Sequence, residues 1–377
     1  MSNIIVLGAG MVGSAMALDL SKNHKVTLAD FNLNSLETVK LKSEKIEVFQ
    51  LDVTQTEKLA DAVKPYDLVV CAVPGFLGFN TLKTIIEAGK NVVDISFFPE
   101  NSLELSQLAV ENKVTAIVDC GVAPGMGNII LGHYNEEMKI TDFECLVGGL
   151  PKVKKWPFSY KAPFSPIDVI EEYTRPARYV ENGHIVTKEA LSDCEFITFE
   201  NTGTLEAFNT DGLRSLVFLM PHIKNMKEKT LRYPGHVDYI KALKSAGFFD
   251  SHPIEYKGQE ISPLEFTSKI LFKEWKLEEG EAEFTVMRIS IKGLDTSNQE
   301  KTVVYDLYDE YNPETRTSSM ARTTGYTATA VANWLLEGNF NQKGVFPPEL
   351  IGKVQGCLPF VINYLQERGV VYKKSVL

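Results

Sequence analysis

The sequence predicts an α/β protein with two domains: an N-terminal doubly wound parallel sheet, and a second α+β domain with a largely antiparallel sheet. Three observations support this expectation. Short apolar segments alternate with helical spacing up to residue 119, and a glycine-rich turn follows the first of them. After residue 122 the apolar segments become longer and half-alternating, with proline and glycine clustered at 149–166 and 253–263.

Six short apolar segments near the N-terminus are typical of buried strands, because nearly all of their side chains are apolar. They are the segments 3–8, 25–30, 46–50, 67–72, 91–94 and 115–119. Between them the apolar residues follow helical spacing at 11–22, 34–42, 56–63, 79–88 and 103–112. Strands and helices in this alternation predict a parallel sheet covered on both faces, which is the Rossmann fold.

The second part of the chain is expected to form an antiparallel sheet. Its longer, half-alternating segments are 143–148, 196–200, 283–292 and 302–309, and helical spacing returns at 323–336 and 347–368. We therefore expect a Rossmann domain over 1–122 and an α+β substrate and dimerisation domain over 123–322. We expect the C-terminal helices of 323–377 to pack back on the Rossmann domain.

Composition and charge exclude several classes of protein. The formal net charge is −10, and an acidic surface repels nucleic-acid phosphates. The five cysteines contain no CxxC pair, which argues against a disulfide framework and a zinc site. No apolar run reaches the roughly 18 residues of a membrane span. We expect a cytoplasmic protein without a metal, nucleic-acid or membrane partner.

The glycine-rich turn is the first candidate site. Residues Gly8–Gly13 read GAGMVG and lie between the first predicted strand and the first predicted helix. In that place Gly8 permits a tight turn, Gly10 lets a pyrophosphate approach the backbone, and Gly13 lets the helix pack on the strand. The helix N-terminus attracts the phosphate charge. Met11 and Val12 complete the predicted cofactor turn.

The ends of the following strands predict the rest of the cofactor site. Asp30 ends the second strand about twenty residues after the glycines, where a carboxylate binds the ribose 2′-hydroxyl and repels a 2′-phosphate. Phe31 and Asn32 come next, with no basic residue. We therefore expect NAD rather than NADP. Other strand ends assigned to the cofactor are Asp52, Val53, Ala72, Val73, Pro74 and Asp94.

Several later motifs are more specific than the glycine-rich turn. In order they are DCGVAPG (119–125), VGGLP (147–151), TLRYPGH (230–236) and MARTTGY (320–326). Together they resemble the saccharopine dehydrogenase family over essentially the whole chain, and most closely its lysine 6-dehydrogenases. Residues 204–214 are similar to a stretch of that branch. Saccharopine reductases typically read GLDPGIDH in the turn, whereas this chain has Ala123 in place of the acid and Gly127–Asn128 in place of DH.

The resemblance implies an NAD-dependent oxidative deamination of L-lysine at the ε-carbon. Hydride passes from an amine-bearing carbon to NAD, the imine is hydrolysed with release of ammonia, and the aldehyde cyclises. The alternative within the family is formation or cleavage of a secondary amine, as in saccharopine or carboxynorspermidine metabolism. A non-catalytic NAD(H) sensor is the third hypothesis, against which the motifs beyond the Rossmann domain argue.

That chemistry requires a cation that binds the substrate carboxylate and a group that removes a proton from the substrate ammonium. Arg232, in the TLRYPGH motif, is the main candidate for the carboxylate, with a structural ion pair as its alternative. Arg322 is a weaker candidate. Asp119 could pair with the substrate amine or cap the turn, and Cys120 could line the pocket or simply pack. The remaining candidates are Ser96 beside the nicotinamide or the substrate, Tyr160 in a loop that could close over the site, and Lys161, which could act as a base if buried and is otherwise a solvated lysine.

His236 shares the Arg232 motif, and none of the histidines lies at metal-ligand spacing from another His or Cys. No metal site is therefore expected. The domain between 123 and 319 is expected to carry a dimer interface, because one face of a long antiparallel sheet must be covered. The sequence thus predicts a homodimer.

Overall fold

The computed structural model describes residues 1–278 and 280–377, which form two compact units. Unit 1 comprises Met1–Ile140, Gly293–Glu300 and Met320–Tyr372. Unit 2 comprises Thr141–Lys292, Lys301–Ser319 and Lys373–Leu377. Unit 1 therefore extends past the predicted boundary at residue 122, and the chain leaves it and returns to it twice.

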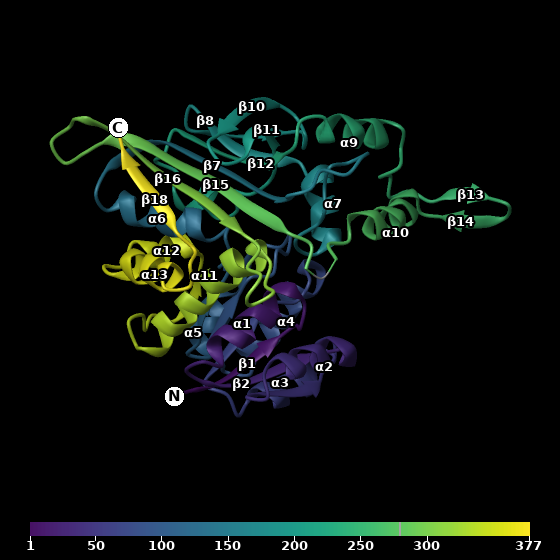
Figure 1. The fold of residues 1–377 in the computed structure, drawn as a ribbon. Coiled ribbons are helices and arrows are strands. Elements are labelled where there is room, and N and C mark those ends of the chain that lie inside the picture. The colour runs from purple at the N-terminus through teal and green to yellow at the C-terminus, as the bar shows by residue number, and fades with distance from the viewer. Residues whose placement is uncertain (279) are drawn as a thin grey trace. The chain divides into compact units, whose positions relative to one another are not determined.

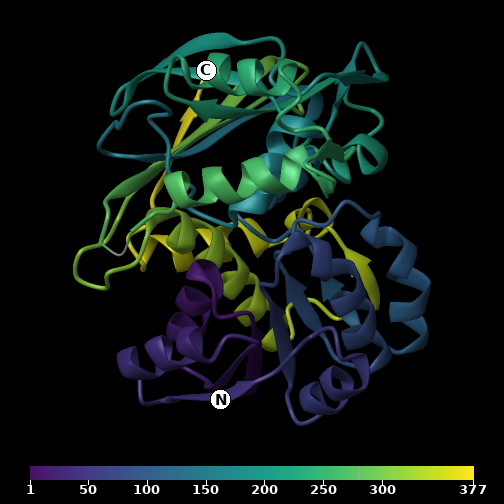
Figure 2. The ribbon, with the colours of Figure 1, turned by 90° about the vertical axis from the view of Figure 1, so that its right-hand side faces the viewer.

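Unit 1 contains a parallel sheet of the Rossmann type, with helices on both of its sides (Figure 2). In the described residues the strand order is β17-β6-β5-β4-β1-β2-β3, and every neighbouring pair is parallel. The strands are β1 (Asn3–Leu7), β2 (Lys25–Asp30), β3 (Ile46–Gln50), β4 (Leu68–Cys71), β5 (Val92–Asp94), β6 (Thr115–Ile117) and β17 (Gly344–Phe346). The predicted parallel sheet is confirmed.

Most helices of unit 1 begin and end close to the predicted residues, but the helix over Met126–Asn135 was not predicted. They are α1 (Met11–Leu20), α2 (Leu33–Lys42), α3 (Thr56–Val63), α4 (Gly75–Glu87), the 3₁₀ turn η1 (Ser102–Leu105), α5 (Ser106–Glu111), α6 (Met126–Asn135), α11 (Ser319–Leu336), α12 (Pro348–Gly352) and α13 (Cys357–Gln366). Helix α4 begins four residues before the predicted start, directly after Pro74. The helix predicted over 347–368 is wrong as one element, because Gly356, with φ +88°, precedes α13.

Strand β17 is the one member of this sheet that the sequence pattern did not predict. It has three residues and follows the helical segment α11, so it has no alternation to detect. Gly344, Val345 and Phe346 pair in parallel with Thr115, Ala116 and Ile117 of β6. The C-terminal part of the chain therefore supplies an edge strand to the N-terminal sheet.

Unit 2 is built on a second, mixed sheet (Figure 1). In the described residues its main path is β10-β11-β12-β7-β15-β16-β18, and β8 and β9 branch from β12. The strands are β7 (Lys139–Pro151), β8 (Ala177–Glu181), β9 (His184–Lys188), β10 (Glu195–Phe199), β11 (Gly203–Asn209), β12 (Asn225–Arg232), β15 (Glu283–Leu294), β16 (Glu300–Glu310) and β18 (Tyr372–Val376). The pairs β10–β11, β11–β12, β8–β9 and β8–β12 are antiparallel, whereas β7 and β12 are parallel.

The helices of unit 2 are α7 (Pro166–Thr174), α8 (Leu216–Leu219), α9 (His236–Ser245) and α10 (Pro263–Trp275). A small hairpin of β13 (Ile254–Tyr256) and β14 (Gln259–Ile261) extends beyond α10 (Figure 1). Side chains of α7, α9 and α10 share a buried aromatic cluster that includes Tyr173, Val237 and Trp275. No helix in the described part of the chain has both the length and the apolar character needed to cross a bilayer.

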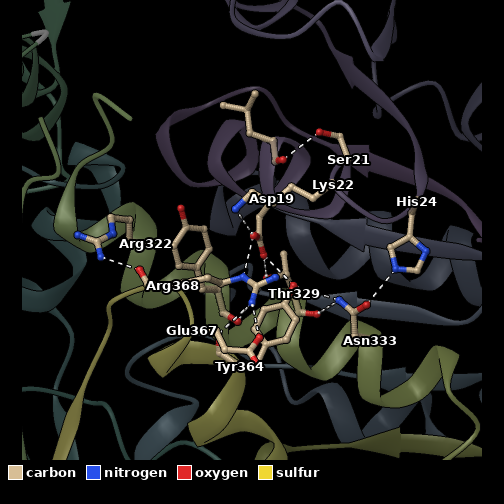
Figure 3. Close-up of polar contacts among 12 residues, drawn as sticks. Asp19, Ser21, Lys22, His24, Arg322, Thr329, Asn333, Tyr364, Glu367 and Arg368 are labelled. Atoms are coloured by element: carbon tan, nitrogen blue, oxygen red, sulfur yellow. Dashed lines mark hydrogen bonds and ion pairs between the residues drawn. The ribbon is translucent and has the colours of Figure 1, made fainter. Parts of the chain in front are cut away.

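A buried carboxylate joins the first helix of unit 1 to the last ones (Figure 3). Asp19 on α1 accepts hydrogen bonds from Thr329 Oγ1 (2.8 Å) on α11, from Tyr364 Oη (2.7 Å) on α13, and from Arg368 Nε (2.7 Å) just after α13. Its side chain is fully buried, and the Arg368 side chain is only 10% exposed. Lys22, also in contact with Asp19 at 3.1 Å, is 59% exposed. The Arg368 pair is therefore the strong contact and the Lys22 pair the weak one.

We expect Asp19→Ala to lower the free energy of unfolding by about 3 kcal/mol, because it leaves the buried Arg368 guanidinium without its partner. Lys22→Ala is the matched control and should change stability by less than about 0.5 kcal/mol, because its ammonium group remains in water. Urea denaturation followed by circular dichroism measures both. Equal effects of the two substitutions would contradict the assignment of Asp19 as a buried anchor.

Candidate active-site residues in the two units

The glycine-rich turn of unit 1 has the geometry that a dinucleotide phosphate requires. Gly8 has φ +100°, and a Cβ there would lie 2.4 Å from the Ala72 carbonyl oxygen. A Cβ at Gly13 would lie 1.9 Å from the Gly8 oxygen. Both positions therefore require glycine so that α1 can pack against the ends of β1 and β4. The sequence motif thus has a steric cause at these two positions.

Gly10 has a different role from the other two glycines. It is the N-cap of α1, it provides no side-chain cap, and nothing lies within 4 Å of the position where its Cβ would be. The first amide groups of α1 therefore open onto free space beside Met11, which is 42% exposed. Unpaired amides at a helix N-terminus attract an anion. The residues present thus fit a bound diphosphate, and Val12 lies one residue further along the same turn.

Asp30 ends β2 and reaches back to the glycine-rich turn. Its Oδ2 accepts a hydrogen bond from the Ala9 amide at 2.6 Å, and its Oδ1 accepts one from the Asn32 amide at 2.7 Å. These two bonds fix the carboxylate beside the turn, while its other lone pairs can still accept hydrogen bonds from a sugar hydroxyl. Asn32 also caps α2 by accepting from the Asn34 amide.

The other predicted cofactor residues lie at the carboxyl ends of β3 and β4. Asp52 is half-buried, and hydrogen bonds from Thr54 and Gln55 lower the pKa of its carboxyl. Val53 packs against the apolar core of unit 1. Ala72, Val73 and Pro74 follow β4 and lead into α4. The parallel strands bring these residues to the same edge of the sheet as Gly8 and Asp30.

Asp94 and Ser96 form a buried polar cluster at the carboxyl end of β5. The Asp94 carboxylate accepts hydrogen bonds from the Ser96 amide (3.0 Å) and the Ser96 hydroxyl (2.9 Å). Both side chains are buried, and Cys71 at the end of β4 lies 3.8 Å from Ser96 Oγ. Burial raises the pKa of Asp94 to about 7, and the nearby Asp119 charge acts in the same direction. This carboxyl therefore titrates in the neutral range.

Asp119 and Cys120 lie just beyond β6, which ends at Ile117 rather than at the predicted residue 119. Both are buried, and burial raises the pKa of the Cys120 thiol well above its usual range. The thiol is therefore protonated at neutral pH and is not a nucleophile. Gly125, with φ +140°, would place a Cβ 1.9 Å from the Gly121 oxygen, so the turn of the DCGVAPG motif requires glycine there.

Arg232 of unit 2 is the last residue of β12 and is only 2% exposed. Its guanidinium lies 4.4 Å from the Tyr160 ring centre. Nε donates to Tyr173 Oη (3.1 Å), Nη1 donates to the Leu231 carbonyl (3.0 Å), and Nη2 donates to Tyr160 Oη (3.3 Å). Nη2 also donates to Glu172 Oε2 at 2.7 Å. Glu172 and Tyr173, both on α7, are residues of this cluster that the sequence did not single out.

His236 follows the same motif and is held in one tautomer. Its Nδ1 lies 2.9 Å from the Phe158 carbonyl oxygen and its Nε2 lies 2.9 Å from Tyr173 Oη. Because a carbonyl only accepts, Nδ1 carries the proton and Nε2 accepts from the tyrosine. Burial, followed by the Arg232 charge, lowers the pKa of His236 to about 3. The ring is therefore neutral and orients Tyr173, which orients Arg232.

Lys161 and Arg322 have partners away from the Arg232 cluster. Lys161 Nζ donates to the Glu274 carbonyl at 2.7 Å, and Arg322 Nη2, in unit 1, donates to the Arg368 carbonyl at 2.9 Å. The structure thus groups Tyr160 with Arg232, and Ser96 with Asp94. Among residues 1–278 and 280–377, no three His, Cys, Asp or Glu side chains are placed to share a metal ion.

The raised pKa of Asp94 has a consequence for stability. Between about pH 4 and pH 7 the folded protein keeps a proton on Asp94 that the unfolded chain releases. This stabilising contribution is fully present below pH 4 and is lost as the pH rises through 7. We expect Asp94→Asn, which cannot ionise, to raise the thermal unfolding midpoint relative to the wild type more at pH 8 than at pH 5.

Differential scanning fluorimetry at both pH values measures this difference. Asp61→Asn is the control, because the Asp61 side chain is 76% exposed and its substitution should shift both midpoints alike. A midpoint shift for Asp94→Asn that is the same at pH 5 and pH 8 would rule out a neutral-range titration of this carboxyl.

The sequence matches two family models that together cover most of the chain. The saccharopine dehydrogenase NADP binding domain matches residues 4–117, and the saccharopine dehydrogenase C-terminal domain matches residues 121–370. Among solved structures, apo saccharopine dehydrogenase (L-Glu forming) from Saccharomyces cerevisiae has a TM-score of 0.81 at 19% identity, with both chains covered completely. Homospermidine synthase from Legionella pneumophila in complex with NAD has a TM-score of 0.68 at 13% identity, covering 100% of this chain and 91% of the other.

Curated relatives have similar names. Carboxyaminopropylagmatine dehydrogenase from Synechocystis is 24% identical, covering 93% of this chain and 92% of the relative. Saccharopine dehydrogenase [NADP(+), L-glutamate-forming] from Schizosaccharomyces pombe is 26% identical, covering 72% of this chain and 64% of the relative. Mouse mitochondrial alpha-aminoadipic semialdehyde synthase is 24% identical, and the chain spans about half of its length, 47%.

These matches agree with the glycine-rich turn and the mixed second sheet. The predicted family is confirmed, together with an oxidoreductase of this type that carries an NAD(P)-binding domain. The chain belongs to the saccharopine dehydrogenase family.

Proposed function

We propose that this protein is an NAD-dependent dehydrogenase that acts on the C–N bond of an amino acid. The observation that carries the proposal is the combination of a dinucleotide turn in unit 1 with a buried arginine in an aromatic cluster in unit 2. The first feature fits a diphosphate, and the second fits a substrate carboxylate. The dinucleotide, when bound, accepts hydride from the amine-bearing carbon.

The residues of unit 1 hold the cofactor in this proposal. The opening amides of α1 at Gly10 and Met11 bind the diphosphate, and the Asp30 carboxylate accepts the ribose hydroxyls. The Asp94 carboxyl titrates near neutrality and is hydrogen-bonded to Ser96 Oγ. It can therefore hold a proton taken from the substrate ammonium, which must become neutral before its carbon can release hydride.

The residues of unit 2 bind and orient the substrate carboxylate. Arg232 supplies the planar donor fork, and its orientation is fixed by Tyr173 and, through it, by neutral His236. Tyr160 covers one face of the guanidinium. A guanidinium removed from water in this way binds an anion more strongly than an exposed one does.

Two substrates within this class have separate support. The names of the relatives, saccharopine dehydrogenase and carboxyaminopropylagmatine dehydrogenase, favour a substrate with a secondary amine. The departures from the saccharopine-reductase turn, Ala123 and Gly127–Asn128, favour the primary ε-amine of L-lysine. Oxidative cleavage of a secondary amine releases another amine, whereas oxidation of L-lysine at the ε-carbon releases ammonia.

The test of function is a panel of L-lysine, saccharopine and polyamines with NAD, read by NADH absorbance together with an ammonia assay. We expect one of the two amino acids to reduce NAD, and Arg232→Lys to lower kcat/KM at least tenfold, because a lysine ammonium cannot keep the contacts with Tyr173 and Tyr160 while it binds the substrate carboxylate. Ammonia release identifies lysine oxidation. If NADH binds but no amine reacts, the protein is a cofactor-binding sensor and the proposal is wrong.

The proposed cofactor preference depends on Asp30, because its carboxylate would repel the 2′-phosphate of NADP and no basic residue follows it directly. We expect a KM for NAD at least tenfold below that for NADP. Asp30→Ala should raise the KM for NAD and reduce that preference, whereas Glu37→Ala, an exposed substitution on α2, should change neither. A wild-type preference for NADP, as named for the fission yeast relative, would contradict this proposal.

A further inference from the structure

The Arg232–Glu172 pair is an unusual element for the interior of unit 2. The two groups meet at 2.7 Å, with side-chain exposures of 2% for Arg232 and 21% for Glu172. Their surroundings are aromatic, since the rings of Tyr160, Tyr173 and Phe208 all lie within 6.0 Å of the guanidinium carbon. Removing both charges from water costs as much as their attraction returns, so stability alone gives little reason for such a pair.

The charge balance of this cluster limits what it can bind. Arg232 is cationic and Glu172 anionic, whereas burial keeps Tyr160 and Tyr173 neutral by raising their pKa values, and His236 is neutral as well. A lone carboxylate entering here would add a second negative group beside the Arg232 guanidinium. That arrangement is strongly unfavourable in a buried site.

A zwitterion avoids this penalty. The head group of an α-amino acid has one carboxylate and one ammonium, so its net charge is zero. The carboxylate can take the place of Glu172 on Arg232 Nη2, while Nε and Nη1 keep their bonds to Tyr173 and Leu231. The ammonium then neutralises the displaced Glu172 carboxylate. One buried ion pair becomes two, and no charge is left uncompensated.

An unsatisfied donor in the same cluster supports a missing ligand. The indole Nε1 of Trp275 is buried and has no hydrogen-bond partner among the described residues. Its ring packs edge-on against Tyr160 and Tyr173, with centroids 5.5 and 6.0 Å apart. A buried N–H without an acceptor destabilises the folded state. The Arg232–Glu172 pair thus shares its aromatic neighbours Tyr160 and Tyr173 with a buried donor that the described residues leave unpaired.

We propose that Arg232 and Glu172 together form a receptor for the zwitterionic head of an α-amino acid, with Arg232 binding the carboxylate and Glu172 binding the α-ammonium. The inference rests on the proposed function, whose substrate it narrows. Glu172 is thus a specificity-determining residue, because it favours ligands that have a free α-amino group next to the carboxylate. When no ligand is bound, Glu172 pairs with Arg232 instead.

The test is isothermal titration calorimetry at pH 7.5 with two ligand pairs, L-lysine with 6-aminohexanoate and L-glutamate with glutarate. Within each pair only the α-ammonium differs. We expect the wild type to bind at least one amino acid about tenfold or more tightly than its partner lacking the α-amino group, because a charge-assisted hydrogen bond to a buried carboxylate is worth that factor. In Glu172→Gln this ratio should fall close to one.

Glu171→Gln is the matched control. Glu171 is the preceding residue of α7, but it pairs with Arg175 at 3.0 Å and its side chain is 46% exposed. It should bind both ligands as the wild type does. A Glu172→Gln protein that keeps the wild-type ratio overturns the inference while leaving the proposed function intact, provided that the enzyme still turns over an amino acid.

Three further outcomes also test the inference. If Glu172→Gln lacks the wild-type near-ultraviolet circular dichroism or unfolds at room temperature, the pair is structural and the inference is wrong. Glu172→Asp, which keeps the charge but shortens the side chain, should retain part of the ratio if the ammonium contact is real. If the wild type binds neither L-lysine nor L-glutamate, the substrate class fails, and the reaction panel then shows whether the dehydrogenase assignment fails with it.

Discussion

The ionic contact between Asp19 and Arg368 sets the position of helix α1, and the rest of unit 1 is arranged around that helix. At one end α1 opens the glycine-rich turn, and at the other its buried carboxylate is held by residues from α11, from α13 and from just beyond α13. The turn approaches β4 so closely that Gly8 and Gly13 admit no side chain. Because α1 is fixed at both ends, the amide groups of its first turn, next to Gly10, have a fixed orientation.

Local patterns were sufficient to predict the elements of the parallel sheet but not those whose pairing is distant in sequence. The first six strands are apolar runs between helices, so their type follows from composition. Strand β17 has only three residues and pairs with β6, more than 200 residues earlier, and β12 runs parallel to β7 although its neighbours β8 and β11 are antiparallel to it. Strand pairing of this kind is determined by tertiary contacts, which a short stretch of sequence does not contain.

In the candidate site, too, the sequence was sufficient to predict residues whose chemistry is local but not those whose chemistry depends on distant contacts. The glycine-rich turn and Asp30 could be found from spacing, because their chemistry is local to a single strand–helix unit. Arg232 was found through its motif, but its partner Glu172 lies sixty residues earlier, on helix α7 just beyond the proline- and glycine-rich stretch at 149–166, without a local signal. The neutral state of His236 and the raised pKa of Asp94 arise from burial, which sequence alone does not reveal. A motif therefore identifies these positions, whereas the protonation states and hydrogen-bond partners of their side chains depend on three-dimensional packing.

The late arrival of strand β17 has a consequence for how the chain matures on the ribosome. Strand β6 is synthesised more than 200 residues before β17, so during translation its outer edge has no pairing partner within the nascent sheet. An unpaired edge strand is a template for association with other chains. Arg368, which anchors Asp19, is also synthesised after β17. The parallel sheet of unit 1 is therefore completed only after residues 141–292 and 301–319 of unit 2 have been translated, although its first strand is synthesised before them.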